Sequence, residues 1–231
     1  LSTLLLPTKG EILIDGQQLT RQRPDLKRKI SVITQEYSMR QDMNMDEIME
    51  FQGRRYFMPR KQIKERTEEL LEFCDLLKFR KRTVRKLSGG MKRKLMVCRA
   101  LLTDPEILLL DEPTAGMDAL SRRQMWNLLR KLNEKNLTIL LTTHYMEEAQ
   151  SLCNRVALMD HGKLEEVSTP SALIESLGAY AVDEMTADGT QNHYFHTRQE
   201  AIRYLEELTG QASLRELSLI HISEPTRLGM I

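Results

Sequence analysis

The sequence predicts an α/β fold in which a mixed, largely parallel sheet carries an inserted helical subdomain. From residue 107 onward, short apolar runs alternate with helical patterns, which is typical of a sheet with crossover helices. Ile107–Leu110 is an uninterrupted apolar run, as expected for a parallel strand that is covered on both faces. The stretch from about 45 to 103 shows helical periodicity instead, so we expect it to form the insertion.

The elements before and within the insertion follow from local patterns. Residues 11–16 favour a short strand closed by a turn, and Ile30–Ile33 favour a second strand. Over residues 62–78, apolar positions at helical spacing lie opposite charged ones, which predicts an amphipathic helix. Ser88 and the two glycines after it open another helix, which is expected to end before Pro105.

The second half of the chain is expected to continue the sheet. The apolar runs that predict strands lie at residues 107–110, 138–143, 156–159 and 164–167. Between them, helical patterns place Met125, Leu128, Leu129 and Leu132 inward and continue over residues 145–153. A turn is expected at His161-Gly162. After residue 171 the pattern weakens, and the one clear helix is expected at Arg198–Leu208.

These elements suggest four regions. Residues 1–44 and 104–170 would together form a discontinuous α/β core. Residues 45–103 would form the inserted helical subdomain, and residues 171–216 a small C-terminal appendage. Residues 217–231 are treated as a separate tail.

Composition limits the classes of function. The net charge of +1 gives no overall field that would attract nucleic acid or an anionic membrane. The longest aliphatic runs are far too short to span a bilayer. Three widely spaced cysteines favour reduced core thiols in a cytosolic protein. For the basic stretch at 78–86, we expect a solvated face rather than a site for nucleic acid or lipid.

The first chemical motif is the acid pair Asp111 and Glu112, directly after the apolar strand. Ligands bind at the carboxyl edge of open α/β sheets, so both side chains would face a ligand there. Asp111 would hold Mg²⁺, directly or through water, because this hard ion prefers oxygen ligands. Glu112 would orient or deprotonate an attacking water. Taken alone, the two acids also fit an ordinary strand-to-turn junction.

The second motif is Ser88-Gly89-Gly90 at the start of a predicted helix. A serine N-cap followed by two glycines presents bare backbone N–H groups at the positive end of a helix. Such an end suits the γ-phosphate of a nucleotide. The same residues also fit a plain helix cap.

Two more polar residues follow strand ends. His144, after the expected strand at 138–143, could hydrogen-bond a phosphate oxygen and the attacking water, although a core histidine satisfied by its neighbours fits as well. Gln35, after Ile30–Ile33, could contact Mg²⁺ or the water, but a single glutamine carries little information.

In combination, the order and spacing of these motifs resemble the ABC ATPase family. Gln35 matches the Q-loop of that family, Leu87–Met91 its signature motif, Ile107–Glu112 its Walker B strand, Ala115–Asp118 its D-loop and His144 its switch histidine. The resemblance covers residues 1 to about 216. Met91 stands where the family most often has Gln, which is similar to the subgroup that serves drug and polysaccharide or lipo-oligosaccharide exporters.

The resemblance implies a P-loop NTPase-like core, with ATP and Mg²⁺ as cofactors. Asp111 and Gln35 would then hold the metal, and Glu112 and His144 would be catalytic. The nucleotide would be bound by Gln35, Ser88, Gly89, Gly90 and Asp118. In this family two such subunits pair head to tail, as a homodimer or a heterodimer. They power a transmembrane permease at the cytoplasmic face of the membrane, here expected to be bacterial, and no nucleic-acid partner is expected.

Both ends depart from the family pattern. The phosphate-binding loop, G-x-x-x-x-G-K-[ST], occurs nowhere in the chain, and the family would have it just before Leu1. Leu1–Pro7 resembles the last turns of a helix stopped by its proline. Residues 217–231 resemble a translated sequencing adapter. We therefore expect an N-terminally truncated chain, inactive by itself, that ends in a non-biological tail.

Two other functions come from different classes. One is a soluble ABC ATPase of DNA repair or translation; the coiled coils or zinc-binding cysteine pairs of the repair type are not evident. The other is a degenerate interaction module, against which the joint presence of Asp111, Glu112 and His144 argues. The segment from Met39 to Met58, rich in methionine and aromatic residues, fits either the core of the subdomain or a surface that docks a membrane partner.

Overall fold

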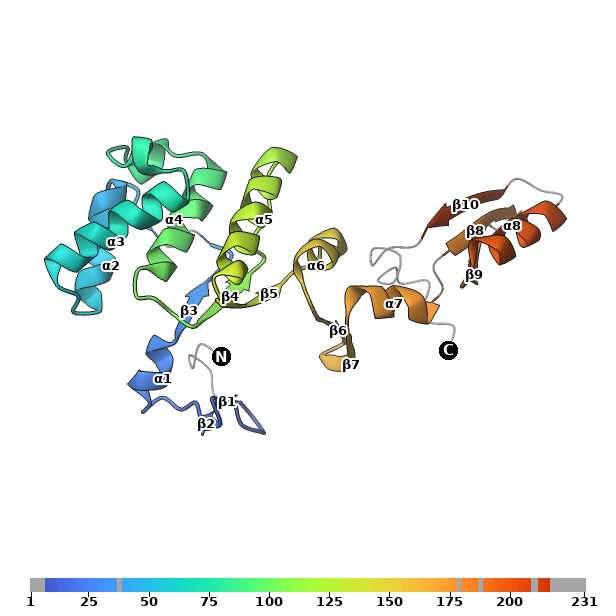
Figure 1. The fold of residues 1–231 in the computed structure, drawn as a ribbon, viewed down its shortest axis with the longest axis horizontal. Coiled ribbons are helices and arrows are strands. Elements are labelled where there is room, and N and C mark those ends of the chain that lie inside the picture. Colours follow the sequence, from blue (N-terminus) through green and yellow to red (C-terminus); the bar gives the residue numbers. More distant parts are fainter. Residues whose placement is uncertain (1–6, 37–38, 178–179, 187–188, 209–211, 217–231) are drawn as a thin grey trace. The chain divides into compact units, whose positions relative to one another are not determined.

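The computed structural model describes residues 7–36, 39–177, 180–186, 189–208 and 212–216 and divides the chain into two units, residues 1–142 and 143–231 (Figure 1). The helix end expected at residues 1–6 and the tail at 217–231 lie outside the described residues. No helix in the described ranges combines the length and the apolar character that crossing a membrane requires.

A three-stranded parallel sheet forms the centre of the first unit. Its strands are β3 (Ile30–Ile33), β4 (Ile107–Asp111) and β5 (Thr138–Thr142), in that order. The register pairs Ile33 with Leu110, and Leu110 with Leu141. The three strands expected from apolar runs are thereby confirmed, with the most apolar one in the middle.

The two faces of this sheet differ. The order β3-β4-β5 advances in one direction, so right-handed crossovers put both α4 (Gly89–Leu101) and α5 (Ala119–Glu134) on the same side. On that side Leu108 is fully buried. On the other side Val32 is 40% exposed and Leu140 is 52% exposed. The expectation that both faces are covered is therefore wrong for the described residues, because the crossover helices occupy one face only.

The helical layer consists of α2 (Met45–Arg55), α3 (Arg60–Phe73) and α4, joined by the short turns η1 (Leu77–Phe79) and η2 (Val84–Lys86) (Figure 1). Asn44 and Glu47 form a reciprocal capping box that fixes the start of α2. The predicted helix at 62–78 is too long at its C-terminal end. Asp75 adopts a left-handed conformation (φ 59°), which breaks the helix before η1.

The N-terminal part of this unit is a small hairpin with a short helix. β1 (Leu13–Ile14) pairs with β2 (Gln17–Gln18), and α1 covers Pro24–Arg28. The predicted single strand at 11–16 is in fact the first arm and turn of this hairpin, and the sequence did not indicate α1.

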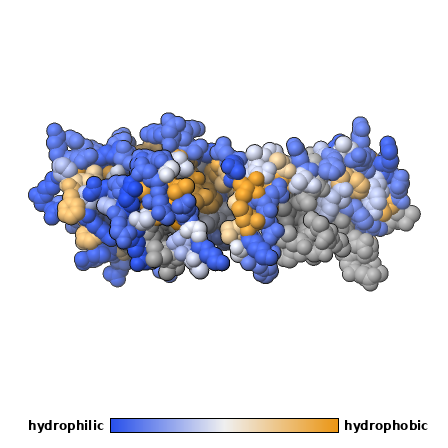
Figure 2. All heavy atoms as spheres, turned by 90° about the horizontal axis from the view of Figure 1, so that it is seen from below, coloured by the Kyte–Doolittle hydropathy of each residue, from blue (hydrophilic) through white to orange (hydrophobic). Residues whose placement is uncertain are grey.

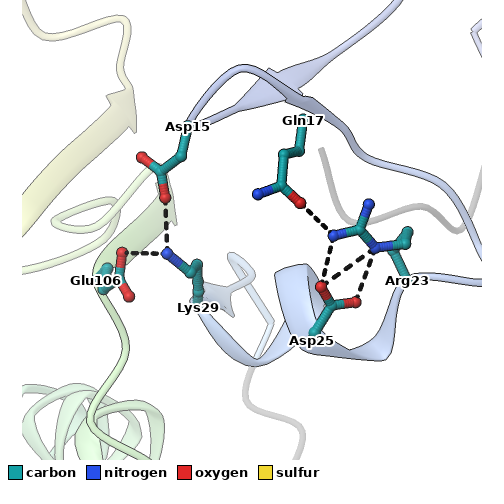
Figure 3. Close-up of polar contacts among 6 residues, drawn as sticks. All are labelled: Asp15, Gln17, Arg23, Asp25, Lys29 and Glu106. Carbon is teal, nitrogen blue, oxygen red and sulfur yellow. Dashed lines mark hydrogen bonds and ion pairs between the residues drawn. The ribbon is translucent and has the colours of Figure 1, made fainter.

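Lys29 ties the hairpin to the sheet. The Lys29 ammonium donates hydrogen bonds to the carboxylates of Asp15 (2.6 Å) and Glu106 (3.0 Å) (Figure 3). Glu106 directly precedes β4. Arg23 binds Asp25 and Gln17 beside it (Figure 3). These contacts lie at the amino end of the strands and leave the carboxyl edge free for other groups.

The second unit starts with α6 (Met146–Leu152), the hairpin β6 (Val156–Asp160) and β7 (Lys163–Ser168), and α7 (Pro170–Leu177). The predicted turn at His161-Gly162 is confirmed, since both residues have positive φ between β6 and β7. Ala149, Val156 and Leu173 form a core cluster.

The appendage is more ordered than predicted. It contains β8 (Tyr180–Thr186), β9 (Gly189–Phe195), α8 (Arg198–Glu207) and β10 (Ala212–Glu216). The strands form an antiparallel sheet in the order β10-β8-β9, and α8 contacts all three. The prediction of a weak tail with one helix was right about α8 and wrong about the strands.

Candidate functional site

Asp111 and Thr142 meet at the carboxyl edge of the parallel sheet. They are the last residues of β4 and β5 and stand opposite each other in the register. The Thr142 hydroxyl donates a hydrogen bond to the Asp111 carboxylate at 2.6 Å. One carboxylate oxygen is thereby held in place at the strand end. The sequence indicated Asp111 but not Thr142.

Glu112 lies at the first turn after β4 in a left-handed conformation, with φ 47°. Such a backbone costs about 1 kcal/mol or more in a residue with a side chain and needs support from its surroundings. The Glu112 amide donates to the carbonyl of Thr142 at 3.1 Å, and its own carbonyl accepts from Ala115 at 3.2 Å. The backbone of Glu112 is therefore held in place directly after the end of β4.

Arg93, on α4, joins the strand-end loops. Its side chain is only 3% exposed. The acceptors of its guanidinium are backbone carbonyls: Thr34 (2.6 Å), Gln35 (3.2 Å), Asp111 (2.8 Å), Glu112 (2.9 Å) and Pro113 (2.9 Å). Sequence reasoning missed this residue, because Arg93 lies off the helix face marked by Met91, Leu95 and Cys98. Gln35 itself is exposed just after β3, and its backbone shares this arginine with the Asp111–Pro113 turn.

The predicted signature segment begins α4. Ser88 is the N-cap, and its hydroxyl accepts a hydrogen bond from the Met91 amide at 3.3 Å. Ser88 and Gly89 are exposed. A Cβ added at Gly90 would lie 3.1 Å from the Ser121 hydroxyl, so a glycine suits the close approach to α5 there.

A cavity of about 390 Å³ adjoins this helix start. Ser88, Gly90 and Met91 line it together with the cationic side chains of Lys78, Lys94 and Lys131. Asp75 also lines the cavity and pairs with Lys94 at 3.7 Å, so the lining carries three ammonium groups against one carboxylate, a balance that favours an anionic ligand.

Asp118 caps α5. Its carboxylate accepts hydrogen bonds from the Ser121 amide (2.9 Å) and the Ser121 hydroxyl (2.6 Å). These bonds lower the pKa of Asp118 below its ordinary value. The structure thus gives Asp118 a local role, and its contact with nucleotide stays a prediction.

His144 is exposed and stacks at a tilt on Tyr145, with 4.1 Å between the ring centroids. It follows β5 by two residues, but the chain divides between Thr142 and Thr143, so His144 belongs to the second unit. Its approach to Glu112 stays a prediction.

The methionine-rich segment divides into two parts. Met45 and Met49, both on α2, are fully buried. Phe51 and Phe57 are 59% and 89% exposed. Figure 2 shows apolar patches on one face of an otherwise largely hydrophilic surface. The core interpretation therefore holds for Met45 and Met49, and docking of a membrane partner stays a prediction.

A second cavity lies beside the exposed aromatic residues. It has about 290 Å³ and is lined by Arg28, Tyr56, Met58, Gln62, Arg66, Leu102, Thr103 and Asp104. Of the basic stretch at 78–86, Arg80 and Lys81 pair with Asp46, and Lys78 and Arg82 lie over the Phe79 ring. Those four cations are thus engaged within the subdomain.

Comparison with known proteins identifies the relatives of this chain. A family model described as ABC transporter matches residues 1–115. Nod factor export ATP-binding protein I of Cupriavidus metallidurans is 38% identical over 173 residues, which are 75% of this chain and 57% of the relative. The linearmycin resistance ATP-binding protein LnrL of Bacillus subtilis is 31% identical over 209 residues, which are 90% of this chain and 67% of the relative.

A third relative and a solved structure are also similar to this chain. The daunorubicin/doxorubicin resistance ATP-binding protein DrrA of Streptomyces peucetius is 33% identical over 228 residues, which are 99% of this chain and 66% of the relative. The chain thus spans 57% to 67% of the length of these relatives. A solved ATP-binding subunit of an ABC transporter has a TM-score of 0.65 and 23% identity over 76% of this chain and 73% of its own, which supports the P-loop NTPase-like fold. The chain belongs to the ABC transporter family.

Proposed function

We propose that this chain belongs to an ATP-hydrolysing subunit that powers an ABC exporter. The observation that carries the proposal is the carboxyl edge of the sheet, where Asp111, Glu112 and the Gln35 loop are joined through Arg93. The names of the relatives, which concern export and drug resistance, support the exporter class.

The donor set at this edge fits Mg²⁺. Asp111 offers a carboxylate, Thr142 a hydroxyl and Gln35 an amide oxygen, all of them the hard oxygen ligands that this ion prefers. Asp111 and Gln35 would hold the ion, which when bound would neutralise charge on the phosphates of ATP. Thr142 keeps the Asp111 carboxylate oriented toward the edge.

Glu112 would position the attacking water and accept its proton. Its turn follows directly on the residue that would hold the ion, so both functions start from one rigid strand end. His144 would hydrogen-bond the γ-phosphate and the water, as the family resemblance implies. Asp118 would contact the nucleotide from the start of α5.

The segment Ser88–Gly90 would bind the γ-phosphate of an ATP held by a second subunit. The exposure of Ser88 and Gly89 and the lysine side chains in the cavity beside them support this role. Two subunits, identical or different, would then close on ATP and separate after hydrolysis.

The test is Glu112→Gln in the full-length gene product. Gln is nearly isosteric but cannot accept a proton, so ATP binding should persist while turnover falls by about 10²–10⁴-fold. Glu106→Gln is the matched control, because Glu106 precedes the opposite end of β4. Near-normal hydrolysis by Glu112→Gln would remove Glu112 from this role.

The permease would dock at the surface formed by Phe51, Tyr56 and Phe57 and the adjoining cavity of about 290 Å³. Exposed aromatic side chains beside a cavity favour a protein partner. This docking would place the subunit at the cytoplasmic face of a bacterial membrane.

A photoreactive amino acid at Phe57 should therefore crosslink to the permease in the assembled transporter. Met159, which is 70% exposed in the second unit, is the control position. Met49 is unsuitable because it is fully buried. Crosslinks from position 57 only within the subunit, or equal permease crosslinks from position 159, would contradict the docking surface.

A further inference from the structure

Among the described residues of the first unit, Arg93 is the one charged residue that is buried. A guanidinium has five N–H donors, and this one donates to backbone carbonyls at the carboxyl ends of both β3 and β4. Nη1 binds the loop after β3, whereas Nη2 and Nε bind the turn after β4. One side chain thus connects three segments that are distant in sequence.

Burying a charged group is costly unless hydrogen bonds replace its hydration. Backbone carbonyls supply that replacement here at 2.6 to 3.2 Å. Because each carbonyl belongs to a fixed peptide plane, the contacts constrain the backbone of the loops rather than their side chains. A plain apolar residue at this position would pack but would leave these carbonyls without the donor.

We propose that Arg93 is a positioning residue for ATP hydrolysis, which holds the Gln35 and Glu112 loops in one arrangement and couples them to the helix that begins at Ser88. This inference rests on the proposed function. The hydrogen bonds from Arg93 to these loops end on backbone carbonyls, so Arg93 acts on the peptide planes beside the two acids.

The Glu112 backbone makes the proposal specific. With φ 47°, this residue is held in a conformation that free chains rarely populate, and the bond from Arg93 to its carbonyl is 2.9 Å. Loss of that bond removes one of the supports of this peptide, whose carbonyl also accepts a hydrogen bond from the Ala115 amide. Since a misplacement of about 1 Å can cost roughly 10²-fold in rate, catalysis should suffer before folding does.

The link to α4 gives this arrangement a second consequence. Ser88 caps the helix five residues before Arg93, which is about 7.5 Å along the axis. If α4 shifts when Ser88–Gly90 binds a phosphate, the hydrogen bonds from Arg93 to the loop carbonyls would therefore shift as well. Binding at the helix start and water activation at Glu112 would be joined by one side chain.

The experiment compares Arg93→Met and Arg93→Lys with Cys98→Ala in the full-length gene product. Cys98 is fully buried on the same helix, so its truncation disturbs packing without touching the loops. Arg93→Met should lower kcat by about tenfold or more while the KM for ATP stays within about twofold. Arg93→Lys, whose ammonium has three donors, should restore part of the loss. Cys98→Ala should leave kcat per folded molecule unchanged.

Amide hydrogen exchange provides a readout without catalysis. Arg93→Met should speed exchange of the Glu112 amide, which is bonded to the Thr142 carbonyl, and of the Ala115 amide, which is bonded to the Glu112 carbonyl, and leave α2 unchanged. If Arg93→Met keeps kcat within twofold, or if Cys98→Ala loses as much kcat as Arg93→Met does, the positioning role is wrong. If the unmodified protein turns over no ATP, or Glu112→Gln remains active, the proposed function fails instead.

Discussion

Gly53 is an example of how much a single residue decides in this fold. It lies on α2, where a Cβ atom would come within 2.5 Å of Ile63 Cγ1 and 2.6 Å of Ile63 Cδ1 on α3. Real Cβ atoms do not approach other atoms that closely, so the two helices can cross here only because the side chain is absent.

Gly53→Ala should therefore lower the free energy of unfolding by about 1–3 kcal/mol. Alanine is the better helix former by about 1 kcal/mol, and the clash must exceed that gain. Urea denaturation of Gly53→Ala, Ile63→Ala and the double variant would measure the coupling. The double variant should lose less than the sum of the two single losses; a Gly53→Ala protein as stable as the parent would contradict the close crossing.

The candidate site shows which residues a sequence can reveal. Asp111 and Glu112 stand out because an apolar strand ends at them, and strand ends gather at one edge. Arg93 and Thr142 gave no such signal. The partners of Arg93 are backbone carbonyls, which every residue has, and Thr142 was one polar residue in a predicted strand. Only the contacts between segments that are distant in sequence show that Arg93 and Thr142 belong to the site.

At the scale of elements, Asp46 holds the start of α2 to the segment after η1. Its carboxylate contacts Arg80 at 2.9 Å and Lys81 at 2.8 Å, and Asp46 is 23% exposed. Burial alone would raise the pKa of Asp46, but the hydrogen bonds and charges of Arg80 and Lys81 outweigh it, and the pKa lies below its ordinary value. The acidic side chain also suits the positive end of the helix.

Asp46→Asn should cost about 1 kcal/mol of stability at neutral pH. Because the pKa is lower in the folded chain, the stabilisation is complete above the unfolded value of about 3.9 and is lost as the pH falls through the folded value. Unfolding curves at pH 7 and in this acidic range would measure it. Asp42→Asn, in the exposed pair with Arg40, should change little; an equal effect at both positions would contradict the special place of Asp46.

The elements differ in how well the sequence predicted them. The strands β3, β4 and β5 were predictable because they are short, apolar and bounded by polar residues. The strands β8 and β9 were not, since residues such as Asp183, Glu184 and Asn192 interrupt any clear alternation. Their pairing is specified by partners on other strands and by α8, which local patterns do not show. The division of the chain into a core and an inserted subdomain stays a prediction.

At the scale of the whole molecule, the proposed pairing of two subunits has a direct consequence. The full-length gene product with Glu112→Gln, mixed with ATP and Mg²⁺, should elute as a dimer, because the closed state cannot be resolved by hydrolysis. Adding Ser88→Arg should return it to the monomer, since bulk at the exposed helix start would block the facing nucleotide.

Size-exclusion chromatography with light scattering gives the measurement. Ser171→Arg is the matched control, because Ser171 is an exposed serine in the second unit. A dimer that survives Ser88→Arg, or that Ser171→Arg abolishes equally, would contradict pairing through the Ser88–Gly90 segment.

The three free cysteines make local opening measurable by reaction rate. Cys74 and Cys98 are buried where α3 ends against α4, and Cys153 is half-buried in the second unit. Burial, followed by the contact with Cys74, raises the pKa of the Cys98 thiol, and burial raises that of Cys153 as well. Since only thiolates react readily, modification must wait until each segment opens to water. The rates at which a thiol reagent modifies Cys98 and Cys153 therefore report local opening in the first and the second unit, and both rates can be followed in one sample.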